Sequence, residues 1–512
     1  MFYTGLYMRS ASSSTSPAAL AAGMQGTIQA RMADSVLQIQ MVDQQERAYG
    51  HSHAVNIDAV LGELTEEPVT DELGAAAPFN IAEVRDLTRN VNKTAYDPHY
   101  VSIGPYHRTK DPRLAKDDEK KRCLRVVRSS AARPGGATVA QYLRELEPRK
   151  DEAWSYYDRS YEADLKSAQF VRMLLLDACY LLVWLGAVDG RPRSDTATAN
   201  DHETLSSSSL PEAAAGDMLE AIAVVRDVLY LAENQIPFFV VDLIHGLTVL
   251  DGHVSAAEAI ARYIRSNILQ RQKYSMVTPA AAELSAAANL LHLLHMHFKP
   301  AEPPSGNGGR ERAGDGELVR WRRATEYSLV AGVQFRARRI GAEEGAQCIL
   351  DVKHGGSCGG TVKIPRLSID GETWRILHNL IALEQSNPAI GSHVTAYCVF
   401  MSQLACTTED VELLSKRGVI VHGLGNHNEV AAGFAKLCKG VAFRVDDADR
   451  DYLWPTYQAL ERCFQSSTRR WMALLRRKYF GNPWLVVGLA AGAVGLACAV
   501  VQAVYSVLAY KH

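Results

Sequence analysis

The sequence lacks several patterns that would assign it to a familiar chemical class. It has nine cysteines in 512 residues but no Cys-x-x-Cys pair, which argues against a zinc ribbon and against a disulfide framework. It has no phosphate-binding loop and no dinucleotide-binding glycine fingerprint, so nothing supports a nucleotide cofactor. A net charge of -2 gives no overall attraction to nucleic acid. We therefore expect a chain with reduced thiols, no cofactor and no nucleic-acid partner.

The N-terminal part also lacks an export signal. Residues 1–23 are rich in Ser and Ala and contain neither a basic start nor an apolar stretch of the required length. Residues 1–78 as a whole show no sustained periodicity. We predict a disordered arm over 1–78 and a body that faces the cytosol.

A long uncharged run is present near the C-terminus. Residues 484–508 contain no charged side chain, and a helix of roughly 25 residues reaches about 37 Å, enough to cross a hydrocarbon core of about 30 Å. The segment before it, 466–482, is basic, which favours a cytosolic body and contact with anionic lipid. We predict a single transmembrane anchor at 483–509, in the plasma membrane or an endomembrane; the alternative is a buried core helix.

Small residues within this run bear on oligomeric state. Gly488 and Gly492 form a Gly-xxx-Gly pair, which lets two membrane helices approach closely. The pattern predicts a homodimer through the anchor, although glycine is also common in single membrane helices.

Helical periodicity dominates the body, 79–465, so we predict a mainly α fold. The expected helices are 164–185, 217–231, 256–270, 279–298, 373–384 and 394–407. Two polar segments rich in Gly, Pro and Ser, 189–216 and 299–316, read as exposed loops. Alternating residues at 347–352 and 361–364 surround a glycine-rich stretch, 355–360, and predict a minor β-hairpin.

Five strings in the body match one plant protein family in order and spacing. They occupy 95–107 (with Tyr96, Pro98, Ser102, Gly104, Pro105, Tyr106 and His107), 170–182, 231–239 (with Glu233, Asn234 and Gln235), 364–385 (ending in Glu384 and Gln385) and 410–420. From residue 79 onward, the chain resembles the plant family catalogued as domain of unknown function 247. Ala178 and Ala232 replace the glycine and leucine that are commoner there.

The resemblance implies a membrane-anchored plant protein with no assigned enzymatic reaction. In grasses, members of this family lie at the two self-incompatibility loci and look like pollen-side determinants that act by recognition. We expect a non-catalytic recognition or signalling protein with an unidentified protein partner. One alternative is a membrane-tethered scaffold in stress or growth signalling, and another is an uncharacterised enzyme that uses buried carboxylates.

Each motif has a structural and a functional interpretation. The Ile103–Tyr106 string predicts a rigid turn with polar tips, either packing the chain or contacting a partner. Glu233, Asn234 and Gln235 precede Pro237, where a helix must end. They can satisfy unpaired backbone groups there. Glu384 and Gln385 repeat the arrangement, and Glu233 with Glu384 could instead form an acid and base pair.

Two further patterns are weaker. His292, His295 and His297 lie in one apolar stretch, and the i, i+3 spacing places His292 and His295 on one helix face. The spacing indicates no third metal ligand beside these two. Residues 355–359 satisfy Gly-x-Ser-x-Gly, but the strand predicted after them is incompatible with a nucleophile elbow, which a helix must follow.

Overall fold

The structure, a computed structural model, describes residues 79–130, 137–158, 165–188, 212–249, 254–301, 322–342, 345–355, 360–443, 451–479 and 483–510. Within these ranges helices predominate and strands are short and few, as the sequence predicts. The arm predicted at 1–78 lies outside the described residues, and so do most of the two polar segments. The polar segment predicted at 189–216 ends earlier than expected, because helix α9 already begins at Glu212.

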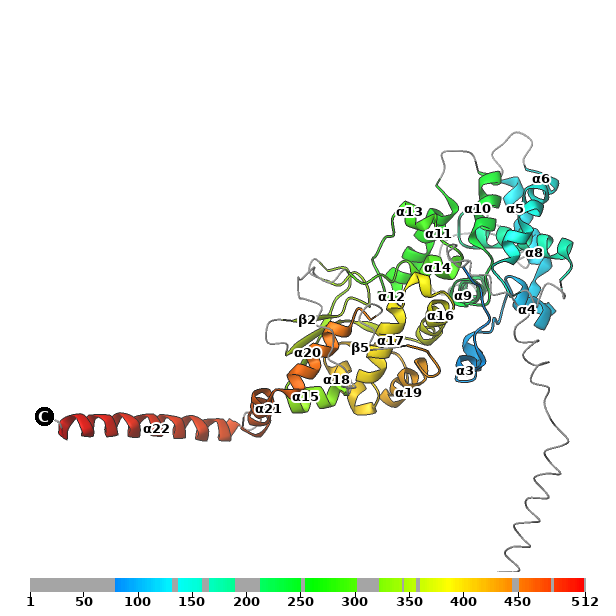
Figure 1. The fold of residues 1–512 in the computed structure, drawn as a ribbon. Helices are drawn as coiled ribbons and strands as arrows, with labels where there is room; N and C mark the ends of the chain where they lie inside the picture. Colours follow the sequence, from blue (N-terminus) through cyan, green and yellow to red (C-terminus); the bar gives the residue numbers. More distant parts are fainter. Residues whose placement is uncertain are drawn as a thin grey trace, which may run out of the picture. The chain divides into compact units, whose positions relative to one another are not determined.

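The first group of helices surrounds one buried helix (Figure 1). This helix, α8 (Ser167–Trp184), contacts α5 (Asp117–Ser129), α6 (Val139–Leu146) and α10 (Phe238–Thr248). Its sequence is apolar nearly all round, which is the pattern of a core helix. It is long and apolar enough to cross a membrane, but 78% of it is buried inside the protein. We therefore interpret α8 as the centre of the hydrophobic core.

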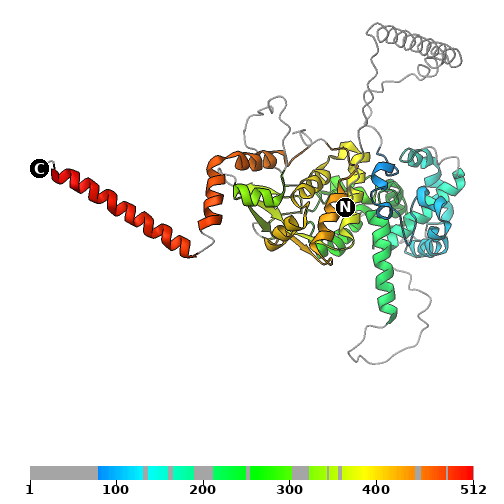
Figure 2. The ribbon, with the colours of Figure 1, turned by 90° about the horizontal axis from the view of Figure 1, so that it is seen from below.

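The second group of helices continues the same core. It comprises α15 (Ala324–Ala331), α16 (Thr373–Ser386), α17 (His393–Leu404), α18 (Thr408–Lys416), α19 (His427–Leu437) and α20 (Trp454–Gln465). Figure 2 shows the yellow and orange members of this group together. Two helices, α9 (Glu212–Tyr230) and α14 (Leu290–His295), both contact α16, and α9 also contacts α8. The two groups are thereby joined.

Short helical elements complete the chain. They are α3 (Asp86–Arg89), η1 (Lys93–Ala95), α4 (Pro105–Lys110), η2 (Pro112–Ala115), η3 (Glu147–Arg149), α7 (Lys150–Trp154), α11 (Ala256–Ile264), the π-helical η5 (Arg265–Leu269), α12 (Gln270–Gln272), α13 (Ala281–Leu284) and η6 (Pro388–Ile390). The helix predicted over 279–298 is wrong as a single element. The chain leaves α13 after Leu284, and the Asn289 side chain then accepts a hydrogen bond from the N–H of His292 to start α14.

The predicted hairpin is present, within a larger β-structure. Strand β2 (Lys353–Gly355) pairs antiparallel with β3 (Thr361–Pro365), but the first strand predicted, 347–352, is wrong, because these residues form a turn and an isolated bridge just before β2. The sequence did not predict β1 (Gln334–Arg338), which is parallel to β3, or the parallel pair β4 (Leu367–Ile369) and β5 (Ile420–His422). Parallel partners are distant in sequence, so local alternation does not reveal them.

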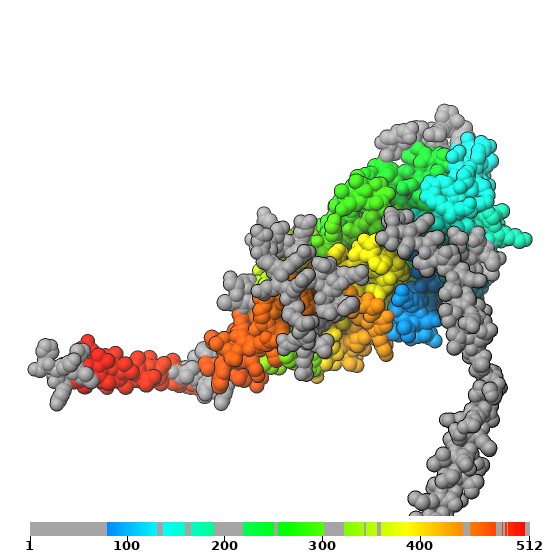
Figure 3. Space-filling model, viewed as in Figure 1, coloured from blue at the N-terminus to red at the C-terminus, as the bar shows by residue number. Residues whose placement is uncertain are grey.

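Two helices end the described chain. The basic helix α21 (Ser467–Tyr479) contacts α15 and α20, and α22 (Pro483–Tyr510) is apolar along its 28 residues. The side chains of α22 that the structure describes are exposed (Figure 3, red). The longest continuous stretch of α22 whose side chains the structure describes, Ala490–Ser506, is by itself shorter than a full membrane span.

Candidate functional site

The 95–107 motif is a buried segment whose backbone is bonded by side chains from other parts of the chain. Asp227, near the end of α9, accepts hydrogen bonds through Oδ2 from the N–H groups of His99, Tyr100 and Val101, at 2.9, 2.6 and 3.0 Å. Asn234 accepts from the N–H of Ile103 at 2.7 Å and donates to the carbonyl of Val101 at 3.0 Å. These side chains supply the partners that a neighbouring strand would supply.

A fully buried ion pair fixes the middle of the motif. Lys120 on α5 and Asp177 on α8 are 2.6 Å apart, and both side chains are 0% exposed. The Lys120 ammonium also donates to the carbonyl of Ser102 at 2.6 Å, and Asp177 accepts from the N–H of Gly104 at 2.8 Å. Because each charge has an opposite charge and a backbone partner, burial is tolerated. The pair ties the motif to two core helices.

Gly104 and Gln235 meet at close range. Gly104 has φ of 75°, and a Cβ there would collide with the carbonyl oxygen of Gln235. The Gln235 amide donates to the carbonyls of Val228 and Leu231 at 2.9 Å each, so it closes the end of α9. Its Oε1 accepts from the N–H of Leu291 at 3.2 Å. Position 104 therefore requires glycine and cannot accept a side chain.

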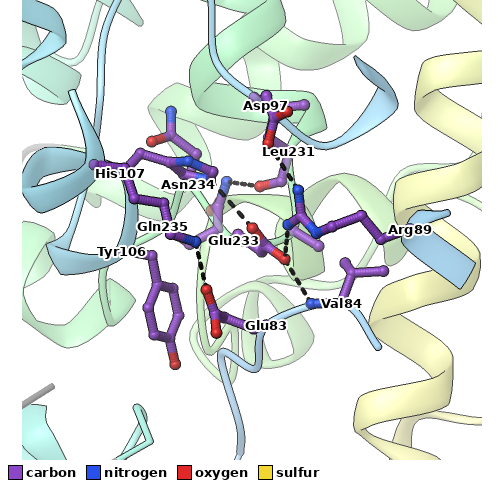
Figure 4. Close-up of polar contacts among 12 residues, drawn as sticks. Glu83, Val84, Arg89, Asp97, Tyr106, His107, Leu231, Glu233, Asn234 and Gln235 are labelled. Carbon is purple, nitrogen blue, oxygen red and sulfur yellow. Dashed lines mark hydrogen bonds and ion pairs between the residues drawn. The ribbon is translucent and has the colours of Figure 1, made fainter. Parts of the chain in front are cut away.

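Glu233 is the ionic centre of this network (Figure 4). Its carboxylate accepts from the N–H of Val84 at 2.5 Å and from the guanidinium of Arg89, and it lies 3.2 Å from Nε2 of His107. Burial alone would raise the pKa of Glu233, but hydrogen bonds from His107 and Arg89 and the Arg89 charge outweigh burial, so the pKa is lowered. Arg89 in turn pairs with Asp97 at 2.8 Å. Glu233 thus fastens the segment before the motif to the end of α9.

Glu384 belongs to a different set of contacts. It accepts from the N–H groups of Val394 and Thr395 at 2.9 and 2.7 Å and from the Thr395 hydroxyl at 2.6 Å, so it caps the first turn of α17. Its other partner is Nε2 of His295, at 2.8 Å. Among the described residues, Glu233 and Glu384 share no partner. The contacts described do not join them as the acid and base pair considered from the sequence, whereas each carboxylate bonds backbone groups as expected.

Most of the motif is buried, so the polar tips expected from the sequence are present at the surface only in part. Buried residues include Tyr96, Pro98, Ser102, Gly104, Pro105, Tyr106 and His107. The Tyr106 hydroxyl donates to the carbonyl of Ile81 at 2.7 Å. Gln385 is partly buried and accepts from the N–H of Ala442 at 3.1 Å. Position 99 is the exposed histidine of the motif.

Sequence reasoning missed four members of the network: Lys120, Asp177, Asp227 and Asn379. Asn379 accepts from the N–H of Ala232 at 2.9 Å and donates to the carbonyl of Ala95 at 2.9 Å. Asp177 could have been found, because it is a lone charge inside the apolar run of α8. Lys120 stands in a run of charged residues, and Asp227 and Asn379 each follow another polar residue, so none of the three stands out as a lone polar residue.

The histidines in and just after α14 make separate contacts. Nδ1 of His292 lies 3.2 Å from the N–H of Ala288, and its ring stacks on Phe79. Nδ1 of His297 lies 2.9 Å from the carbonyl of Leu293. In the described ranges, no group of three His, Cys, Asp or Glu side chains is placed to hold a metal ion.

Comparison with known proteins places this network in a family. The family model described as a plant protein of unknown function, domain of unknown function 247, matches residues 81–498. A UPF0481 protein of Arabidopsis thaliana is 24% identical over 444 residues, which cover 82% of this chain and 85% of that protein. No solved structure matches the chain. The matched region contains the 95–107 motif and every residue of its network, and the chain belongs to the domain of unknown function 247 family of plant proteins.

Proposed function

We propose that the chain is a non-catalytic recognition or signalling protein that its C-terminal helix anchors in a membrane. The observation that carries this proposal is the exposed apolar surface of α22. Trp484, Val494 and Leu496 are 83, 64 and 69% exposed, and all 28 residues of the helix lack charge. Exposing such a surface to water is costly, whereas a bilayer would cover it. At about 1.5 Å per residue the helix is about 42 Å long, enough for a tilted span.

The polar network supports a non-catalytic role for the body. The carboxylates of Asp227, Glu233 and Glu384 each accept backbone N–H groups. Asp177 does the same and is paired with Lys120. Groups committed in this way stabilise the fold and are poorly suited to transfer protons to a substrate. We therefore assign the network to joining the helices of the body.

The narrower form of the proposal is a pollen-side self-incompatibility determinant of a grass, acting through a protein partner. It is supported by the family resemblance. A membrane-tethered scaffold in stress or growth signalling is the alternative, and both forms place the body in the cytosol. Contact between Gly488 and Gly492 of two copies would make the anchor a homodimer.

Two measurements on the full chain in plant cells test the anchor and its topology. Carbonate washing should leave the chain in the membrane fraction, and truncation before Pro483 should release it. Protease added to sealed vesicles should then digest an N-terminal tag, and the partly exposed Asn92 sequon should carry no glycan. Release of the full chain by carbonate would refute the anchor. A protected tag with a glycosylated Asn92 would instead refute the cytosolic orientation.

A further inference from the structure

Four arginines from three separate segments line one cavity of about 500 Å³. They are Arg336 on β1, Arg417 at the end of α18, and Arg476 and Arg477 on α21. Among the residues that the structure describes, no aspartate or glutamate lines the cavity. Arg336 donates a hydrogen bond to the amide of Gln334 at 3.0 Å, and none of the four forms an ion pair within the described ranges. The described part of the chain thus gathers positive charge around the cavity without an acidic side chain to balance it.

The packing of α21 directs its basic side toward the body. Ala473 lies against Gly332, since a Cβ added at Gly332 would be 3.4 Å from the Ala473 Cβ. The Arg470 guanidinium lies 6.0 Å from the centre of the Phe464 ring. Arg476 and Arg477 follow Ala473 by three and four residues, so they share its side of the helix. This packing places both guanidiniums in the wall of the cavity.

The opposite side of α21 carries exposed apolar side chains. Trp471, Leu474 and Leu475 occupy neighbouring positions on the helix surface and are 69, 48 and 42% exposed. A surface helix of a soluble protein normally turns its apolar side inward and its charges outward. The reversed orientation is suited to a helix whose apolar side enters the interfacial region of a bilayer while its charges face the protein.

We propose that this cavity binds the phosphate-bearing headgroup of an anionic membrane lipid. Guanidinium groups donate paired hydrogen bonds to phosphate oxygens, and several of them around one cavity favour a headgroup with more than one phosphate. The volume is within the range of small-ligand sites. Leu329, which is 54% exposed, also lines the cavity and offers apolar contact to the glycerol and acyl part of a lipid.

Distance along the chain favours a lipid over a dissolved phosphate compound. Pro483, where α22 begins, follows Arg477 by only six positions, and six steps along the chain span at most about 21 Å. If α22 is embedded in a bilayer, the cavity is held close to the headgroups. The choice of a lipid therefore rests on the proposed anchor, whereas the affinity for phosphate groups does not.

Calorimetric titration of the full chain in neutral detergent micelles tests the cavity directly. The ligands are dioctanoyl phosphatidylinositol bisphosphate, dioctanoyl phosphatidylcholine and soluble inositol trisphosphate. The test variant is Arg336→Gln/Arg417→Gln, which changes two exposed cavity residues. The control is Arg125→Gln/Arg144→Gln, which removes the same charge from exposed positions on α5 and α6. Thermal melting of both variants verifies that each is folded.

We expect the phosphoinositide to bind the wild type and the control equally, and the cavity variant at least about tenfold more weakly. Phosphatidylcholine should not bind, and inositol trisphosphate should bind several-fold more weakly than the lipid. Equal binding by the cavity variant and the control would overturn the site, as would no binding to the wild type. Inositol trisphosphate binding as tightly as the lipid would overturn the lipid assignment. A chain that binds the lipid but is released from membranes by carbonate would refute only the anchor.

Discussion

Replacing Lys120 by methionine should strongly destabilise the body. The substitution keeps most of the side-chain volume and removes the ammonium, which lies 2.6 Å from Asp177 and 2.6 Å from the carbonyl of Ser102. The Asp177 carboxylate then remains buried without its counter-charge. Removing one partner of a buried ion pair costs about 3 to 5 kcal/mol. Because unfolding entropy scales with chain length, a body of several hundred residues should lose about 3 to 7 °C of Tm.

The neighbouring lysine provides a matched control. Lys121 pairs with Asp118 at 2.8 Å, but these side chains are 48 and 92% exposed, and such pairs contribute little to stability. Thermal unfolding of the full chain, followed by circular dichroism, should therefore separate Lys120→Met clearly from Lys121→Met. Replacing Lys120 and Asp177 together by apolar residues should cost less than the sum of the two single changes. Equal melting temperatures for the two single lysine variants would refute the reasoning.

Three further predictions concern stability. Gly104→Ala should lower the free energy of unfolding by about 2 kcal/mol or more, because the methyl group would meet the Gln235 carbonyl at a positive φ. The control Gly246→Ala lies in an exposed and open helical position and should raise the free energy of unfolding by about 0.5 to 1 kcal/mol. Urea unfolding of both variants measures the contrast. Burial, with a contribution from the charge of His295, lowers the pKa of His292 to about 4. The stability that His292 contributes should be present above about pH 6.5 and lost as the pH falls toward 4, so His292→Gln should flatten melting temperature against pH across this window. Glu384→Gln should weaken the cap of α17 by about 1 to 3 kcal/mol. Hydrogen exchange should then be faster at the amides of Val394 and Thr395, and unchanged exchange there would contradict the capping role.

Much of the helical architecture could be predicted because its signal is local. The run that forms α8 is apolar over successive turns, and the predicted 164–185 contains the observed Ser167–Trp184. Prediction failed at 279–298, where apolar periodicity continues through a break. The break depends on the Asn289 cap and on the N–H of Phe238, which donates to the carbonyl of Ala288 at 2.8 Å. A contact between residues some fifty positions apart leaves no local pattern.

In the candidate site, too, the local features could be predicted from the sequence and the distant contacts could not. The sequence determined that Glu233, Asn234 and Gln235 stand at a helix end and that backbone groups there need partners. It did not determine which groups they bind, because the N–H of Val84 and that of Ile103 are both more than 120 residues away. The same limit applies to the 95–107 motif: the sequence leaves open whether it packs the chain or contacts a partner, and only the structure shows that Tyr96 and Tyr106 are 0% exposed.

The sequence by itself determined the helical class, the apolar C-terminal helix and the basic segment before it, because periodicity and composition are properties of neighbouring residues. Only the tertiary structure decided that Lys120 meets Asp177, that Glu233 and Glu384 belong to separate networks, and that Arg336 and Arg417 join the arginines of α21 around one cavity. Each of these depends on which helix faces pack together, and the side chains that meet there are distant in the sequence.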